Sequence, residues 1–129
     1  EHPMNIVLVE DCEMIRNQLQ RLINALPGVH VVGTAESEET AIAQILLWHP
    51  DAIVLDLSLA SGNGVRVLEA IRKAGCRTRV LVLTNHTGDV LRKTCEGFGI
   101  AGFYDKSNEV YTCLDHLNSL VPYFPEHRP

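Results

Sequence analysis

Short runs of consecutive apolar residues alternate along the chain with longer segments in which apolar residues recur every three or four positions. A short, uninterrupted apolar run is typical of a strand buried on both faces, whereas the wider spacing is typical of an amphipathic helix. The sequence therefore predicts a regular alternation of strands and helices. The expected strands are residues 6–9, 29–35, 52–55, 80–83 and 100–104.

The first two helical segments carry start and stop signals. Helical spacing runs from Ile15 to Leu26 and is ended by Pro27 and Gly28. Ser37 is a good N-cap for the second helix, because the two glutamates that follow it are favoured by the helix dipole. The buried face of this second helix is expected to comprise Ala41, Ile42, Ile45, Leu46 and Trp48.

Three more helical segments follow in the second half of the chain. The first comes after a glycine-rich loop and carries Val65, Leu68 and Ile71. The next begins near Asp89 and places on one side Val90, Leu91, Thr94, Cys95 and Phe98. Ser107 is expected to cap the last helix. Its buried stripe comprises Val110, Leu114, Leu117 and Val121.

Five strand-and-helix units in alternation predict an α/β fold. Right-handed crossovers between successive strands then give a doubly wound parallel sheet with helices on both faces. The length of 129 residues suits one domain, which we expect to span 4–121, followed by a short proline-rich tail or linker at 122–129.

Polar side chains follow four of the five predicted strands. Glu10 and Asp11 come after the first strand, Asp56 after the third, Thr84 after the fourth and Lys106 after the fifth. In an open parallel sheet the carboxyl ends of the strands form the ligand-binding edge. Like charges ~4 Å apart repel by about 4 kcal/mol at an effective dielectric of 20, so three carboxylates there require a proton or a cation. Oxygen ligands with room for water suit Mg²⁺.

The remaining groups at this edge suit phosphoryl transfer. Aspartate is a known covalent carrier of phosphoryl groups, which makes Asp56 the candidate acceptor. Lys106 supplies a compact positive charge for a phosphoryl group or for Asp56 itself, and Thr84 supplies a hydroxyl donor to the same oxygens. Because phosphoryl transfer depends mostly on positioning and charge neutralisation, these few side chains suffice.

The order and spacing of Glu10-Asp11, Asp56, Thr84 and Lys106 resemble those of the response-regulator receiver domains of two-component signalling, over residues 5–121. The resemblance implies the flavodoxin-like strand order 2-1-3-4-5, which chemotaxis receivers also have. It also implies that Asp56 is phosphorylated by a sensor histidine kinase or a His-phosphotransfer protein.

The same resemblance assigns roles to the other residues. Asp11 and Asp56 bind Mg²⁺ directly, together with the backbone carbonyl of Ser58, while Glu10 acts mainly through a bound water. Thr84 is the switch hydroxyl that moves toward the phosphoryl group, and Lys106 pairs with that group.

Phe103 matches the switch aromatic of the family, because it lies three residues before Lys106. Strand register decides whether Phe103 or its neighbour Tyr104 turns inward; we expect Phe103 to do so and Tyr104 to be an ordinary packing residue. Ser107 stands where the family usually has proline. Asn85 and His86 flank the expected crevice, and a solvated loop is the simpler interpretation of both.

Composition narrows the functional classes. Eleven basic against sixteen acidic residues give a net charge of −5, which argues against non-specific binding to nucleic acid or anionic membrane. No apolar stretch approaches the roughly 18 residues of a membrane span. The four cysteines lack metal-binding spacing and indicate reduced thiols in a cytoplasmic protein; Cys12, beside the acidic pair, is assigned to packing.

Three functional hypotheses follow. The first is a phosphorylation-activated switch, not an enzyme, in which the surface of the fourth helix, fifth strand and last helix changes its affinity for an unknown downstream protein or a missing effector domain. The second is a Mg²⁺-dependent phosphohydrolase with an aspartyl-phosphate intermediate, which the absence of an acid beside Asp56 in Leu57-Ser58 disfavours. The third is a receiver fold kept only as a dimerisation scaffold. The sequence leaves the oligomeric state open, a phosphorylation-dependent dimer included.

Overall fold

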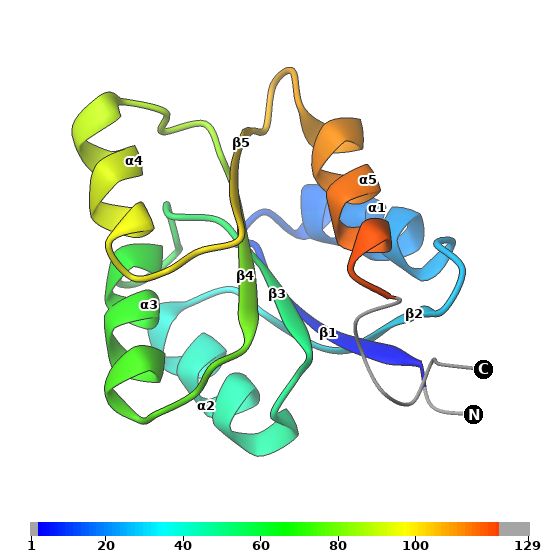
Figure 1. Cartoon of the computed structure of the whole chain (residues 1–129), viewed down its shortest axis with the longest axis horizontal. Coiled ribbons are helices and arrows are strands. Elements are labelled where there is room, and N and C mark those ends of the chain that lie inside the picture. The colour runs from blue at the N-terminus through cyan, green and yellow to red at the C-terminus, as the bar shows by residue number, and fades with distance from the viewer. Residues whose placement is uncertain (1–2, 122–129) are drawn as a thin grey trace.

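The computed structural model describes residues 3–121, in which strands and helices alternate strictly (Figure 1). The predicted tail at 122–129 lies outside the described residues. The strands are β1 (Met4–Val9), β2 (Val29–Ala35), β3 (Ala52–Leu55), β4 (Arg79–Thr84) and β5 (Gly102–Asp105). The helices are α1 (Glu13–Asn24), α2 (Glu38–Trp48), α3 (Gly64–Lys73), α4 (Asp89–Glu96) and α5 (Val110–Ser119).

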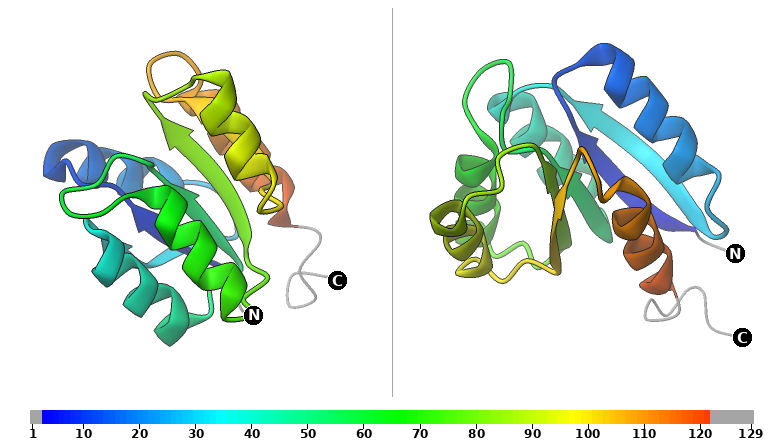
Figure 2. Two further views of the ribbon diagram at one scale, coloured as in Figure 1. Left: turned by 90° about the vertical axis from the view of Figure 1, so that its left-hand side faces the viewer. Right: turned by 90° about the horizontal axis from the view of Figure 1, so that it is seen from above.

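The strands form one parallel sheet in the order β2-β1-β3-β4-β5, which confirms the predicted fold class and strand order. Helices α1 and α5 cover one face of the sheet, and α2, α3 and α4 cover the other (Figures 1 and 2). All five strands therefore end at the same edge. Over the part of the chain described, no helix combines the length and apolar character needed to cross a bilayer.

Side-chain alternation along the central strands builds two separate cores. In β1, Ile6 and Leu8 pack beneath α1 and α5, whereas Val7 and Val9 pack beneath α2 and α3. Because both faces of the sheet are covered, both sets of side chains are buried. This arrangement explains why the central strands are uninterrupted apolar runs.

Helix capping follows the prediction for one helix and departs from it for another. Ser37 caps α2 in a reciprocal box with Thr40, as expected, and Asn63, which was not predicted as a cap, caps α3. Ser107 does not cap α5, which begins later, after Glu109. The backbone N–H of Ser107 instead donates to the Asp105 carboxylate at 2.9 Å, and this short loop delays the start of the helix.

The expected burial of α2 was wrong for two residues. Leu46 and Trp48 are 41% and 48% exposed, and only Ala41 and Ile45 are fully buried. Because α2 lies along the edge of the sheet near β2, a single narrow stripe of the helix reaches the core. Helix α4 also buries only part of the side predicted for it, because Cys95 is buried whereas Val90 is exposed.

Arg72 links the two loops that lead into β4 and β5, at the edge of the sheet where the strands begin. Its guanidinium nitrogens donate to backbone carbonyls on the α3–β4 connection, at 3.0 Å to Cys76 and 3.1 Å to Thr78. They also donate to the α4–β5 connection, at 2.8 Å to Phe98 and 3.3 Å to Gly99. One side chain at the end of α3 therefore fixes the C-terminal end of α4.

Candidate functional site

The acidic residues predicted to converge do so. Glu10 and Asp11 directly follow β1, and Asp56 directly follows the neighbouring strand β3. One carboxylate oxygen from each of the three lies within 4.8 Å of the others, the only such acidic grouping within residues 3–121. Glu10 and Asp56 are buried, and Asp11 is half-buried. The strand order alone brings together residues 46 positions apart, because β1 and β3 are hydrogen-bonded neighbours.

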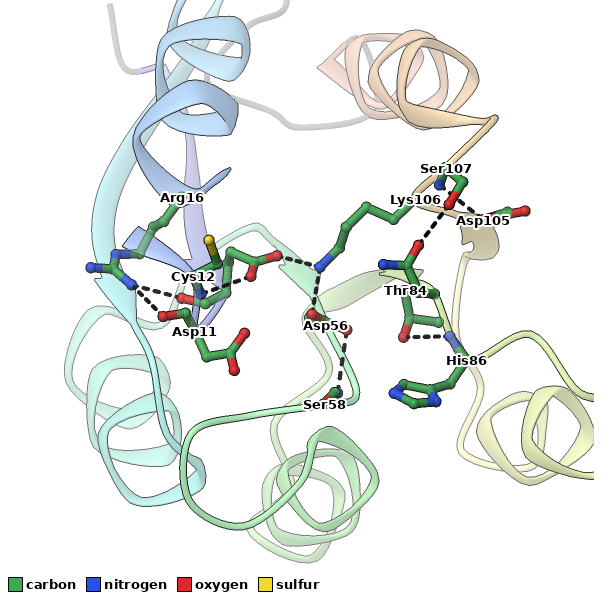
Figure 3. Close-up of polar contacts among 12 residues, drawn as sticks. Asp11, Cys12, Arg16, Asp56, Ser58, Thr84, His86, Asp105, Lys106 and Ser107 are labelled. Carbon is green, nitrogen blue, oxygen red and sulfur yellow. Dashed lines mark hydrogen bonds and ion pairs between the residues drawn. The ribbon is translucent and has the colours of Figure 1, made fainter. Parts of the chain in front are cut away.

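Lys106 is the cation of this cluster. Its Nζ lies 2.6 Å from Asp56 Oδ2 and 2.5 Å from Glu10 Oε1, and Figure 3 shows the side chain pointing toward Asp56. The pairing with Asp56 was expected, but the equally close pairing with Glu10 was not. Since Lys106 follows β5 at the far side of the sheet, only its long side chain can span β4 to reach both carboxylates.

Charge and burial compete at this ion pair. Burial alone would lower the pKa of Lys106, but hydrogen bonds to Asp56 and Glu10 outweigh it and raise the pKa above its ordinary value. Burial raises the pKa of Glu10, and Lys106 offsets only part of that effect. The ammonium therefore stays charged at neutral pH, and the buried Glu10 carboxylate, with its raised pKa, depends on this cation to stay ionised.

Backbone groups hold the two buried carboxylates in place. Glu10 Oε2 accepts from the Cys12 N–H at 2.9 Å, which turns the side chain toward the strand ends. Asp56 Oδ1 accepts from the Ser58 N–H at 3.3 Å, and the Asp56 N–H donates to Val9 on β1. Both carboxylates are thus oriented before any ligand arrives.

Gly64 is required for the turn that follows Asp56. A Cβ at this position would lie 2.4 Å from the Asp56 carbonyl oxygen and 2.8 Å from Leu57 Cα. These are backbone atoms in the buried strand end, which cannot shift at low cost. Any side chain at Gly64 would therefore push the loop that carries Asp56 and Ser58 away from its place.

A cavity of about 210 Å³ lies over these groups. This space is large enough for a partly hydrated cation beside a small ligand. Its lining comprises Glu10, Asp11, Cys12, Ile15, Asp56, Ser58, Asn85, His86 and Lys106. Asn85 and His86, expected to flank the crevice in a solvated loop, are exposed and line this cavity.

Thr84 is fully buried at the end of β4 and does not line the cavity. Its Oγ1 accepts from the His86 N–H at 3.2 Å, so the hydroxyl faces its own loop (Figure 3). The next residue, Asn85, accepts through Oδ1 from the Ser107 hydroxyl at 2.9 Å. Ser107 thus has a partner on the β4–α4 loop that its assignment as a helix cap did not suggest.

The two aromatic residues of β5 lie on opposite faces of the sheet. Phe103 is 6% exposed and packs in the core beneath α3 and α4, with the Arg92 guanidinium carbon 4.6 Å from the ring centroid. Tyr104 packs toward α5, where its hydroxyl is 2.5 Å from His116 Nδ1. The register therefore buries Phe103 as expected.

The cysteines form no disulfide within the described residues, as expected of reduced thiols. The assignment of Cys12 to packing was wrong, because its side chain is exposed and lines the cavity. Cys12 lies at the N-cap position of α1, where the chain leaves the sheet edge and turns toward solvent.

A family description, the response regulator receiver domain, matches residues 6–118. The chain belongs to this family. Receiver domains are phosphorylation-activated signalling switches, and the match confirms the signalling hypothesis while giving no support to the phosphohydrolase.

Relatives of this receiver domain include the nitrate/nitrite response regulator NarL of Escherichia coli K12, 32% identical over 103 residues that cover 76% of the chain and 48% of NarL. The chain spans about half the length of the curated relatives it matches.

Among solved structures, a LuxR-family response regulator from Aurantimonas has a TM-score of 0.85 at 26% identity, covering 97% of this chain and 92% of that one. The CheX-CheY-BeF₃-Mg complex from Borrelia burgdorferi has a TM-score of 0.84 at 22% identity, covering 92% of this chain and 90% of that one. At this identity the match shows only that the fold is shared.

Proposed function

We propose that Asp56 accepts a phosphoryl group from the phosphohistidine of a sensor histidine kinase or a His-phosphotransfer protein. The observation that carries the proposal is the shared ion pair of Lys106 with Glu10 and Asp56 at the base of a cavity of about 210 Å³. An Asp56 carboxylate oxygen attacks phosphorus while the phosphorus–nitrogen bond breaks and the imidazole keeps the electron pair. Lys106 then balances the charge that the phosphoryl group adds.

The carboxylate set also fits Mg²⁺. Three carboxylate oxygens within 4.8 Å of one another carry more negative charge than the single Lys106 ammonium neutralises. We propose that Asp11, Asp56 and the Ser58 backbone carbonyl bind the ion directly, and that Glu10 acts through a bound water. When bound, Mg²⁺ neutralises oxygens of the acceptor and of the transferred group. The Borrelia complex, solved with BeF₃ and Mg, supports the same combination in a similar fold.

The proposed output begins at Thr84. Its hydroxyl turns from the His86 N–H, from which its oxygen accepts, and donates to a phosphoryl oxygen. The buried Phe103 ring follows because Thr84 and Phe103 belong to the adjacent strands β4 and β5. The surface made by α4, β5 and α5 then changes its affinity for a partner. This partner is an unknown downstream protein or an effector domain, and a phosphorylation-dependent dimer is compatible with the same surface.

We propose that the unit spans residues 4–121 and chemically changes only itself, gaining and losing its own phosphoryl group. Its compartment is proposed to be cytoplasmic, which suits its free thiols, and it does not bind nucleic acid directly.

The test is incubation with acetyl phosphate and Mg²⁺, followed by intact-protein mass spectrometry. Wild type is expected to gain one phosphoryl group, Asp56→Asn none, and the exposed-site control Asp115→Asn the same as wild type. A phosphoryl adduct on Asp56→Asn contradicts the acceptor assignment. Steady release of phosphate from p-nitrophenyl phosphate would instead favour the phosphohydrolase.

A further inference from the structure

A side-chain hydrogen bond joins the two loops that carry Thr84 and Lys106. Asn85 directly follows Thr84, Ser107 directly follows Lys106, and the Ser107 hydroxyl donates to Asn85 Oδ1 at 2.9 Å. Figure 3 shows this contact leaving Ser107 across the gap between the loops. A proline after Lys106 could not make this bond, because proline has no side-chain donor.

The end of the bond on Ser107 is held firmly. The Ser107 N–H donates to Asp105 Oδ1 at 2.9 Å, and Asn108 Nδ2 donates to Asp105 Oδ2 at 3.0 Å. The Asp105 N–H in turn donates to Glu109 Oε1 at 2.9 Å. The β5–α5 loop is therefore fixed by its own contacts, and the hydrogen bond to Ser107 restrains Asn85 and the β4–α4 loop that it begins.

Strand order gives this restraint a direction. The sheet runs β3-β4-β5, so Asp56 lies on one side of Thr84 and Ser107 lies on the other. For the Thr84 hydroxyl to reach a phosphoryl group on Asp56, the start of the β4–α4 loop must shift toward β3. The bond between Asn85 and Ser107 holds that same point toward β5.

A second contact in the loop acts in the same sense. Thr84 Oγ1 accepts from the His86 N–H, which holds the hydroxyl oxygen on the loop side and leaves its O–H free to donate. The Thr84 carbonyl is also bonded to the Lys106 N–H at 2.9 Å, which anchors its backbone to β5. The part of Thr84 that is free to respond is therefore its side chain together with the loop that starts at Asn85.

We propose that Asn85 and Ser107 form a clasp that positions Thr84 away from Asp56 in the unmodified protein and so sets the threshold of the switch. The inference rests on the proposed function of Asp56 and Thr84. Asn85 and Ser107 are positioning residues, because they act through Thr84 and take no part in the transfer itself.

The expected effect follows from linkage. A ligand that binds only the rearranged state binds more weakly when few molecules are in that state. A variant that destabilises the resting state increases the population of the rearranged state, so it raises the apparent affinity for the ligand. One exposed hydrogen bond changes such a population by about two- to fivefold. Asn85→Ala and Ser107→Ala should each tighten BeF₃⁻ binding in Mg²⁺ by that factor. The double variant should match either single variant, because all three remove the same bond.

The experiment is a BeF₃⁻ titration at saturating Mg²⁺, followed by two-dimensional NMR, with amide exchange of His86 measured before ligand is added. Ser107→Thr keeps the hydroxyl and should restore wild-type affinity. Ser119→Ala makes the same substitution at an exposed position near the end of α5, outside both loops, and should leave the affinity unchanged. His86 exchange should be faster in Ser107→Ala than in wild type.

Unchanged or weaker BeF₃⁻ binding by both alanine variants overturns the clasp, as does an additive double variant. If wild type takes up no BeF₃⁻ at all, the proposed function fails. The exchange rate of His86 in the unliganded protein still tests the clasp separately, because unaltered exchange in Ser107→Ala means that Thr84 is not held through Ser107.

Discussion

Replacing Lys106 with methionine removes the shared cation and keeps a side chain of similar length. Glu10 and Asp56 would then face each other with side chains only 2% and 6% exposed. Breaking a buried ion pair by deleting one partner typically costs about 3–5 kcal/mol. The chain has one way to reduce that cost, which is to protonate a carboxyl group.

Protonation limits the loss. At about 1.4 kcal/mol per pH unit, protonating Glu10 at pH 7, from its ordinary pKa of 4.5, costs about 3 kcal/mol. We therefore expect Lys106→Met to lower the free energy of unfolding by about 3 kcal/mol at pH 7. The folded variant binds one proton more than its unfolded chain, so its stability rises relative to that of wild type as pH falls. Its loss of unfolding free energy relative to wild type therefore drops below about 1 kcal/mol at pH 5.

Urea unfolding followed by circular dichroism at pH 7 and pH 5, without divalent metal, measures both values. Lys93→Met, at an exposed position of α4, serves as the matched control and should change stability little at either pH. A Lys106→Met variant as stable as wild type at pH 7, or one whose deficit is the same at pH 5, would contradict the interpretation of Lys106 as a shared counter-ion.

Three other predictions concern the acidic cluster and the thiols. Asp11→Asn relieves repulsion and should raise the melting temperature of the metal-free protein by several degrees, while calorimetry shows about tenfold weaker Mg²⁺ binding. At pH 8, iodoacetamide should modify exposed Cys12 but not Cys113, whose burial raises its pKa to about 12. Native Cys113 keeps its proton where the unfolded thiol, with an ordinary pKa of 9.0, loses it, so stability should fall from pH 9 toward pH 12, and less steeply in Cys113→Ala.

The convergence of Glu10, Asp11 and Asp56 could be predicted from the sequence because it depends only on strand order. In a parallel sheet every strand ends at the same edge, so polar residues that follow neighbouring strands are placed close together without knowledge of side chains. The burial of Phe103 needed only the register of one strand.

Contacts that depend on side-chain reach or loop path were beyond the sequence pattern. Nothing in the spacing shows that Lys106 reaches Glu10 as well as Asp56, or that Ser107 turns toward Asn85 and away from α5. The exposure of Trp48 was missed for a related reason. An apolar residue at helical spacing predicts a buried face only when the sheet beneath is wide enough to cover it, and α2 lies over the edge strand.

The four carbonyl contacts of Arg72 have a mechanical consequence for α4. Two of them, to Phe98 and Gly99, tether the C-terminal end of the helix, whereas its N-terminal end follows Gly88, which makes no side-chain cap. A helix that is held at one end tilts about that end and does not shift along its axis. We therefore expect a displacement of the β4–α4 loop to tilt α4 about Phe98, with the largest movement at its exposed first turn, at Asp89 and Val90.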